Sequence, residues 1–183
     1  FSGVEVEGKR CLDAGASTGG FTDVLLRRGA EKVVAVDVGY GQLAWELRQD
    51  PRVVIHDRTN IRHLTGEMVG EPIDLVVADL SFISLTLVLP ALAAVSKPDA
   101  DFVLMVKPQF EVGREKLGAG GVVRDPALRK AAVIEVAESA YDVGLGTLGI
   151  AFPARHVRTI EFYFPVAIAV GLFVLAISLP HGL

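Results

Sequence analysis

Five short apolar runs, each rich in Val, Ile and Leu, alternate along the chain with segments of helical pattern. The runs lie at residues 9–13, 32–37, 52–57, 73–79 and 101–107. Short continuous apolar runs are typical of strands that are buried on both faces of a parallel sheet. The alternation therefore predicts an α/β fold with a doubly wound, mostly parallel sheet.

Four segments between and after these runs are predicted to be helices, at residues 22–28, 42–49, 85–96 and 126–144. Gly29 suits the end of the first helix, and Pro90 predicts that the third is short or kinked. Asp125 and Pro126 are typical of an N-cap followed by a first helical residue, so they mark the start of the fourth helix.

Each of the five predicted strands ends on a charged residue: Asp13, Asp37, Asp57, Asp79 and Lys107. The carboxyl ends of parallel strands meet at one edge of a sheet, and ligands bind beyond that edge in open α/β folds. A single charge is a common strand terminator, but five in succession indicate a functional site at this edge.

A glycine-rich turn at residues 15–20 (GASTGG) follows the first predicted strand. Such a turn lets the backbone approach a bound cofactor closely. A dinucleotide-binding turn has its second glycine where Ser17 stands here, and Asp13 would repel a pyrophosphate. These features argue against NAD and favour S-adenosylmethionine, which carries a cationic amino group and a sulfonium but no phosphate.

Two further acids suit a nucleoside. Asp37 lies 18 residues after Gly19, near the roughly 20-residue spacing of the acid that binds ribose hydroxyls in dinucleotide folds. Both candidate cofactors contain a ribose diol, so Asp37 does not choose between them. Asp57 is a candidate acceptor for an adenine amino group, or alternatively a cap for residues 59–64.

Composition narrows the classes of function. The chain has 183 residues and a net charge of −4, so its overall charge gives no reason to expect nucleic-acid binding. The single Cys11 cannot form an internal disulfide, which favours a reducing, cytoplasmic compartment. The four histidines show no metal-ligand spacing, so no metal is expected. Because the chain begins at Phe1, we expect it to be a fragment whose N-terminal part is missing.

Four motifs occur in order, at residues 13–22 (DAGASTGGFT), 35–43 (AVDVGYGQL), 76–85 (VVADLSFISL) and 105–113 (MVKPQFEVG). They closely resemble the TlyA (hemolysin A-like) ribosomal RNA methyltransferases, relatives of the FtsJ-type 2′-O-ribose methyltransferases. The resemblance implies a Rossmann-like class I methyltransferase fold, S-adenosylmethionine as methyl donor, and the 2′-hydroxyl of ribosomal RNA cytidines as acceptor. It implies a cofactor site formed by Asp13, Gly15, Ala16, Ser17, Gly19, Gly20, Phe21, Asp37, Val38, Asp57 and Asp79.

The same resemblance implies a catalytic set of two lysines, an aspartate and a glutamate. Asp79 matches the aspartate, Lys107 the second lysine and Glu161 the glutamate, although Thr159 stands where the family has Asn. The first lysine and an S4-type RNA-binding domain are expected upstream of Phe1, so we expect weak methyl transfer by this chain alone. The chemistry agrees, because a ribose hydroxyl needs a base within hydrogen-bond reach before it attacks a sulfonium methyl.

RNA binding would require contacts to phosphates despite the acidic total charge. Several cations flank the predicted active edge, either as a basic rim or as ordinary charged surface. They are Arg52, Arg58, Arg62, Arg114, Lys116, Arg124, Arg155 and Arg158.

The C-terminal sequence departs from the pattern of the rest of the chain. Residues 162–180 carry no charge, which meets the length of about 18 residues for a membrane span, but Pro165 shortens the run. We divide the chain into a methyltransferase domain at 1–164 and a tail at 165–183. The tail is a last strand with a buried segment, a membrane anchor, or a foreign end.

Two alternative functions stay open at this point. One is a small-molecule methyltransferase on the same fold, which would need no pairing of Lys107 with Asp79. The other is a non-catalytic cofactor-binding or membrane-active (hemolysin-like) fragment, for which the apolar tail is the only support among the residues.

Overall fold

The computed structural model describes residues 4–113, 115, 117–118, 120–151 and 173–178. Its described strands form one seven-stranded sheet in the order β3-β2-β1-β4-β5-β7-β6. In chain order the strands are β1 (Arg10–Ala14), β2 (Lys32–Val36), β3 (Val53–His56), β4 (Ile73–Ala78), β5 (Ser96–Val106), β6 (Gly146–Ala151) and β7 (Phe173–Ser178).

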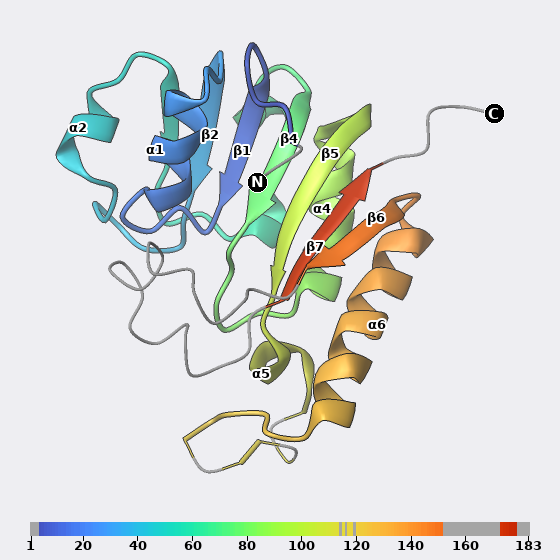
Figure 1. The fold of residues 1–183 in the computed structure, drawn as a ribbon. Coiled ribbons are helices and arrows are strands. Elements are labelled where there is room, and N and C mark those ends of the chain that lie inside the picture. Colours follow the sequence, from blue (N-terminus) through green and yellow to red (C-terminus); the bar gives the residue numbers. More distant parts are fainter. Residues whose placement is uncertain (1–3, 114, 116, 119, 152–172, 179–183) are drawn as a thin grey trace.

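The direction in which the chain adds strands reverses beside β1. β2 and β3 extend the sheet to one side of β1, and β4 and β5 extend it to the other, all of them parallel. β7 then pairs antiparallel with both β5 and β6. The carboxyl ends of β1 to β5 therefore share one edge of the sheet, the lower edge in Figure 1. A reversal of this kind creates a crevice for ligands beyond the strand ends.

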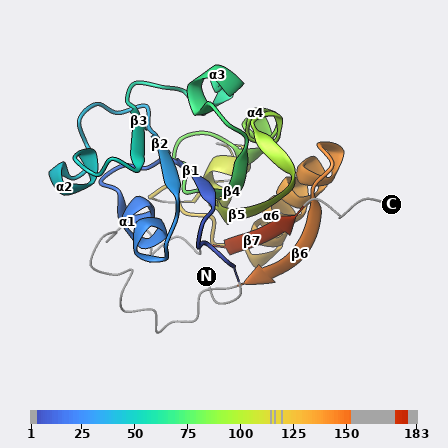
Figure 2. The ribbon, with the colours of Figure 1, turned by 90° about the horizontal axis from the view of Figure 1, so that it is seen from above.

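Helices cover both faces of the sheet, as the view from above shows (Figure 2). α1 packs on one face through Leu25 and Leu26, whereas α4 and α6 contribute to the core on the other face. The helices are α1 (Gly20–Arg27), α2 (Trp45–Arg48), α3 (Gly66–Val69), α4 (Leu89–Ala94), α5 (Pro108–Glu111) and α6 (Pro126–Asp142), with the 3₁₀ turns η1 (Ile61–His63) and η2 (Leu85–Leu87).

Burial on both faces explains why the strands are continuous apolar runs. In β4, Leu75 and Val77 belong to the core under α1, while Val76 and Ala78 belong to the core under α4 and α6. Successive side chains of a strand point to opposite faces, so neither set can be polar. The predicted doubly wound, mostly parallel α/β fold is confirmed.

Several boundaries differ from those predicted. β5 begins at Ser96 rather than Asp101, because its polar first half pairs with β4 across a register shift. Residues 42–49 are helical only over Trp45–Arg48, and residues 85–96 divide into η2 and α4 near Pro90. The Asp125 carboxylate caps α6 by accepting the N–H of Ala127.

The apolar tail contributes a strand to the sheet. Residues Phe173–Ser178 form β7, which lies between β5 and β6. The rest of the tail and Glu161 lie outside the described residues. No helix in the described part of the chain has the length and apolar character that a membrane crossing requires.

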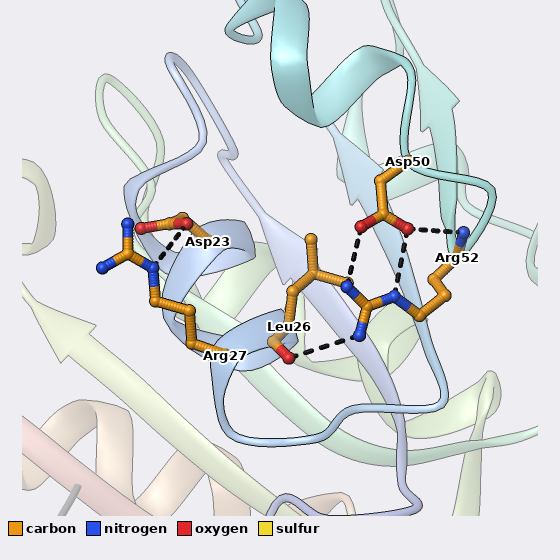
Figure 3. A network of polar contacts seen from close by, with 5 residues as sticks. All are labelled: Asp23, Leu26, Arg27, Asp50 and Arg52. Carbon is orange, nitrogen blue, oxygen red and sulfur yellow. Dashed lines mark hydrogen bonds and ion pairs between the residues drawn. The ribbon is translucent and has the colours of Figure 1, made fainter.

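Arg52 does not lie at the active edge, contrary to its predicted place in a basic rim. It precedes β3, at the amino ends of the strands, where its side chain forms an ion pair of 2.7 Å with Asp50. Its guanidinium also donates to the carbonyl of Leu26 at the end of α1, beside the Asp23–Arg27 ion pair (Figure 3). The role of Arg52 is therefore to fasten the start of β3 to α1.

Candidate active site

The carboxyl ends of β4 and β5 bring together a carboxylate and an amine. Asp79 and Lys107 follow these adjacent strands directly, and Lys107 Nζ lies 2.6 Å from Asp79 Oδ1. Lys107 Nζ also donates to Ser81 Oγ at 3.0 Å. The side chains of Asp79 and Lys107 are only 8% and 13% exposed. A salt bridge that is so shielded from water is costly to assemble, so its position beyond the strand ends indicates function.

A third carboxylate is buried where β1 ends. Asp13 has no exposed surface, and its Oδ2 accepts a hydrogen bond of 2.6 Å from Thr22 Oγ1 on α1. Its Oδ1 has no hydrogen-bond partner. Burial raises the pKa of Asp13 to about 6, and the hydrogen bond from Thr22 only partly offsets that rise. A buried oxygen without a partner marks a position that a cationic or N–H-bearing ligand can satisfy.

This burial predicts a pH-dependent stability defect. The pKa of Asp13 is about 6 in the folded protein and about 3.9 in an unfolded chain. The folded state therefore holds the proton more tightly, so the free energy of unfolding falls as pH rises from about 4 through about 6, by on the order of 3 kcal/mol. Asp13→Asn removes this loss. In urea unfolding, the free energy of unfolding of Asp13→Asn should rise relative to that of wild type as pH increases across that window. A constant difference at every pH would contradict the raised pKa of Asp13. Asp23→Asn, at a partly exposed carboxylate of α1 that pairs with Arg27, serves as the control.

The glycine turn is pressed against the strand that carries Asp79. Gly15 has φ +86°, and a Cβ atom at Gly15 would lie 2.7 Å from the backbone oxygen of Asp79. At Gly19, with φ +98°, a Cβ atom would overlap the side chains of Leu43 and Leu47. Only glycine fits positions that combine a positive φ with so little space. The glycine turn and the Asp79–Lys107 pair are therefore parts of one packed unit.

Asp37 braces the same turn from the end of β2. Its Oδ2 accepts the backbone N–H of Ser17 at 2.9 Å, and its Oδ1 accepts that of Gly39 at 2.7 Å. Ser17 itself has φ +48°. Each carboxylate oxygen can accept a second hydrogen bond, so Asp37 can hold the turn and still receive a ribose hydroxyl.

Asp57 forms an ion pair rather than a cap. Its Oδ2 lies 3.2 Å from Arg48 Nη1 and accepts the N–H of Gly41 at the same distance. The alternative that Asp57 caps residues 59–64 is wrong, because Asn60 performs that role by accepting the N–H of Arg62. Asp57 thus ties the β3 end to the loop that follows Asp37.

The other residues of the predicted cofactor set differ in exposure. Ala16 is buried, Phe21 is partly buried in the first turn of α1, and Val38 is 70% exposed beside Asp37. Gly20 begins α1 and has open space beside its Cα. The set therefore follows a path from the turn to the end of β2.

Exposed aromatic side chains follow the ends of β2 and β4. Tyr40 is 68% exposed and Trp45 is 70% exposed, and the guanidinium of Arg58 lies 4.2 Å from the centre of the Tyr40 ring. Phe82 is 91% exposed, has φ +65°, and lies 5.2 Å from Phe110 between ring centroids. Large exposed aromatics that follow strand ends at the ligand-binding edge of a sheet are typical of a binding surface.

Several of these features were missed by sequence reasoning. Thr22, Ser81 and the aromatic residues were not assigned, because their roles depend on contacts between segments distant in sequence. Of these residues, the exposed aromatics could have been found from the sequence more easily than Thr22 and Ser81, because each follows the end of a strand. Within the described residues, no cluster of three or more His, Cys, Asp or Glu side chains has the arrangement of a metal site.

Comparison with known proteins finds the same methyltransferase family that the sequence motifs resemble. The model of the FtsJ-like methyltransferase family matches residues 1–166. The 16S/23S rRNA (cytidine-2′-O)-methyltransferase TlyA of Mycobacterium tuberculosis is 63% identical over 147 residues, which cover 80% of this chain and 55% of that protein.

Two solved structures show the same fold. One, from a Streptococcus thermophilus protein named as a hemolysin, superposes with a TM-score of 0.85 at 38% identity, covering 96% of this chain and 60% of that one. The other, an S-adenosylmethionine-dependent methyltransferase from Mesorhizobium loti, has a TM-score of 0.66 at 14% identity, covers 96% and 93%, and bears on the fold alone. With the family match and the 63% identity, these findings establish that the chain belongs to the FtsJ-like methyltransferase family.

Proposed function

We propose that this chain transfers a methyl group from S-adenosylmethionine to the ribose 2′-hydroxyl of ribosomal RNA, at cytidines. The observation that carries the proposal is the shielded Asp79–Lys107 pair at the carboxyl edge of the sheet. The M. tuberculosis relative, whose printed name gives this reaction, supports it. This chain spans 55% of that relative's length.

The turn after β1 fits S-adenosylmethionine better than a dinucleotide. The N–H of Ser17, which would face a pyrophosphate in a dinucleotide fold, is engaged by the carboxylate of Asp37. Asp13 adds a second carboxyl group with an unpartnered oxygen. Two acids at this turn would repel phosphates and attract a cation. The ligand we assign to the turn is therefore a cationic nucleoside.

Cofactor titration tests this assignment. We expect wild-type protein to bind S-adenosylmethionine in preference to NAD. Asp37→Ala should weaken binding by about 1.5–3 kcal/mol, the range of charge-assisted hydrogen bonds. Asp101→Ala, which removes a carboxylate paired with Lys9 outside the site, should leave affinity unchanged. Equal affinity of wild type and Asp37→Ala in isothermal titration would remove Asp37 from the cofactor site.

The residues of the pair have distinct tasks in the proposed reaction. When bound, S-adenosylmethionine supplies an electrophilic methyl group on a sulfonium. In its neutral amine form, Lys107 would take the proton of the ribose hydroxyl and become an ammonium, for which Asp79 and Ser81 provide acceptors at the strand ends. Asp79 and Ser81 direct that nitrogen, and in-line placement of the reacting atoms supplies much of the rate. Glu161 stays a predicted member of the set.

The aromatic residues support a nucleotide substrate. Sequence-specific RNA recognition uses unstacked bases that stack on aromatic side chains or on guanidinium planes. Phe82 offers such an exposed ring directly after Ser81, which Lys107 contacts, and Arg58 with Tyr40 offers a second stacked surface after β3 and β2. Arg62 adds a cation in η1 for phosphate contacts. A small-molecule methyltransferase would not need this exposed surface.

The direct test is methyl incorporation into ribosomal RNA. Full-length protein, tritiated S-adenosylmethionine and ribosomal subunits should give labelled RNA in which the modified linkage resists alkali, because cleavage needs a free 2′-hydroxyl. Labelled RNA that is fully sensitive to alkali would place the methyl group on a base. Absence of label in RNA, with label in a small acceptor, would favour the small-molecule alternative.

The proposal also has consequences for the cellular compartment of the enzyme and for the part of the chain that performs the reaction. Ribosomal RNA as substrate places the enzyme in the cytoplasm, and we assign its chemistry to residues 1–164. No metal takes part in the steps proposed for Lys107 and Asp79. A membrane-active function has no support among the described residues, and rests on the printed names of relatives such as the S. thermophilus protein.

A further inference from the structure

Two loops hold the proposed catalytic pair, and they touch at three points. The first loop, residues 79–85, follows β4 and begins with Asp79. The second consists of Lys107 and the short helix α5. Lys107 contacts Asp79 and Ser81, and the rings of Phe110 and Phe82 lie 5.2 Å apart. The third point of contact is Glu111.

Glu111 fastens the far ends of these loops. Its Oε2 accepts a hydrogen bond of 2.5 Å from Ser84 Oγ, and its Oε1 accepts the backbone N–H of Leu85 at 3.1 Å. Ser84 also caps η2 by accepting the N–H of Thr86 at 3.1 Å. Burial raises the pKa of Glu111, while the hydrogen bonds from Ser84 and Leu85 act against that rise. Both oxygens are thus used to join α5 to the start of η2.

The loop between these contacts needs such a restraint. Phe82 has φ +65°, in the left-handed region that bulky residues avoid. A strained backbone persists only where its surroundings determine it from several sides. Here Lys107 restrains Ser81 on one side of Phe82, and Glu111 restrains Ser84 on the other.

We propose that Glu111 is a positioning residue for methyl transfer, which sets the geometry of the Asp79–Lys107 pair by holding the residue 79–85 loop against α5. This inference rests on the proposed function. Glu111 is not a catalytic residue, because its two oxygens are directed to Ser84 and Leu85 rather than to Lys107. Its effect reaches the reaction through the loop.

Kinetics of Glu111 variants test the proposal. Glu111→Ala should lower kcat about 100-fold, the effect expected of a displacement of about 1 Å at a reacting centre. Affinity for S-adenosylmethionine should stay within about twofold, since the glycine turn makes no use of Glu111. Ser84→Ala should lower kcat less than Glu111→Ala does, because the hydrogen bond from the Leu85 N–H to Glu111 remains. In the double variant kcat should fall no further than in Glu111→Ala, because the two substitutions remove partners of the same contact.

Controls separate positioning from general damage. Glu138→Gln makes the same change as Glu111→Gln at an exposed position of α6 and should leave kcat unchanged. Amide hydrogen exchange of residues 80–85 should accelerate in Glu111→Gln while that of β1 and β2 does not. Unchanged exchange, or unchanged kcat in both Glu111 variants, would overturn the proposal. An inactive full-length wild type would instead reject the proposed function, and the exchange measurement would still decide the role of Glu111.

Discussion

Lys107→Met is expected to lower methyl transfer to ribosomal RNA by about 10²–10⁴-fold, the usual contribution of a positioned acid or base. The amine is held 2.6 Å from Asp79 and donates to Ser81 at the ends of β4 and β5. Lys107→Arg should fail as well, because a guanidinium stays protonated and cannot serve as a base. Cofactor affinity should change little in either variant.

The chain offers a matched control at the other end of the same strand. Lys97 lies in β5 and forms an ion pair with Asp74 that is also 2.6 Å long, but at the amino ends of the strands. Lys97→Met should therefore leave kcat near the wild-type value. Tritiated methyl incorporation by the full-length variants checks all three. Near wild-type turnover by Lys107→Arg would show that the reaction needs only a positive charge at this position.

Gly15→Ala is expected to abolish cofactor binding and to lower the free energy of unfolding by about 2–5 kcal/mol. A positive φ costs an alanine about 1–2 kcal/mol, and forced overpacking adds about 1–3 kcal/mol. The added Cβ would press on the backbone oxygen of Asp79 at 2.7 Å, so the turn or the strand end must move. Either movement disturbs both the cofactor site and the Asp79–Lys107 pair.

Gly8→Ala separates the conformational cost of a positive φ from the cost of overpacking. Gly8 also has a positive φ, +70°, but a Cβ there would meet no atom within 4 Å. Its variant should show the conformational cost alone, with cofactor affinity unchanged. Urea unfolding and titration with S-adenosylmethionine provide both readouts. If Gly15→Ala and Gly8→Ala lower the free energy of unfolding equally and both keep cofactor affinity, the contact between the turn and Asp79 does not contribute to cofactor binding.

The sheet, and the edge at which the charged residues after its strands gather, could be predicted because each depends on local sequence. A strand buried on both faces must be continuously apolar, and the charge that ends it must lie at the sheet edge. β6 gave no such signal, since its sequence GTLGIA contains two glycines. β7 lies within an apolar stretch in which Pro165 is a boundary but does not mark where the strand begins, and pairing with β5 and β6 locates it.

The partners of the site residues could not be predicted in the same way. Asp37 was expected to bind ribose, but its bonds to the Ser17 and Gly39 N–H groups depend on how two loops meet. Arg52 was expected near the active edge, yet it precedes β3 rather than following it, and a count of arginines does not distinguish the two ends of a strand. Side-chain pairing is a tertiary property, and it decides most of the chemistry.

The place of β7 has a consequence for how the molecule folds. Val106 of β5 pairs with Phe173 of β7, so this part of the sheet has a high contact order. During synthesis, β5 and β6 leave the ribosome before the strand that must lie between them. Until β7 emerges, both present unpaired edges, which invite association with other chains. Folding therefore requires β7 to pair between two segments that precede it in the chain, and both segments stay open to association with other chains until it does.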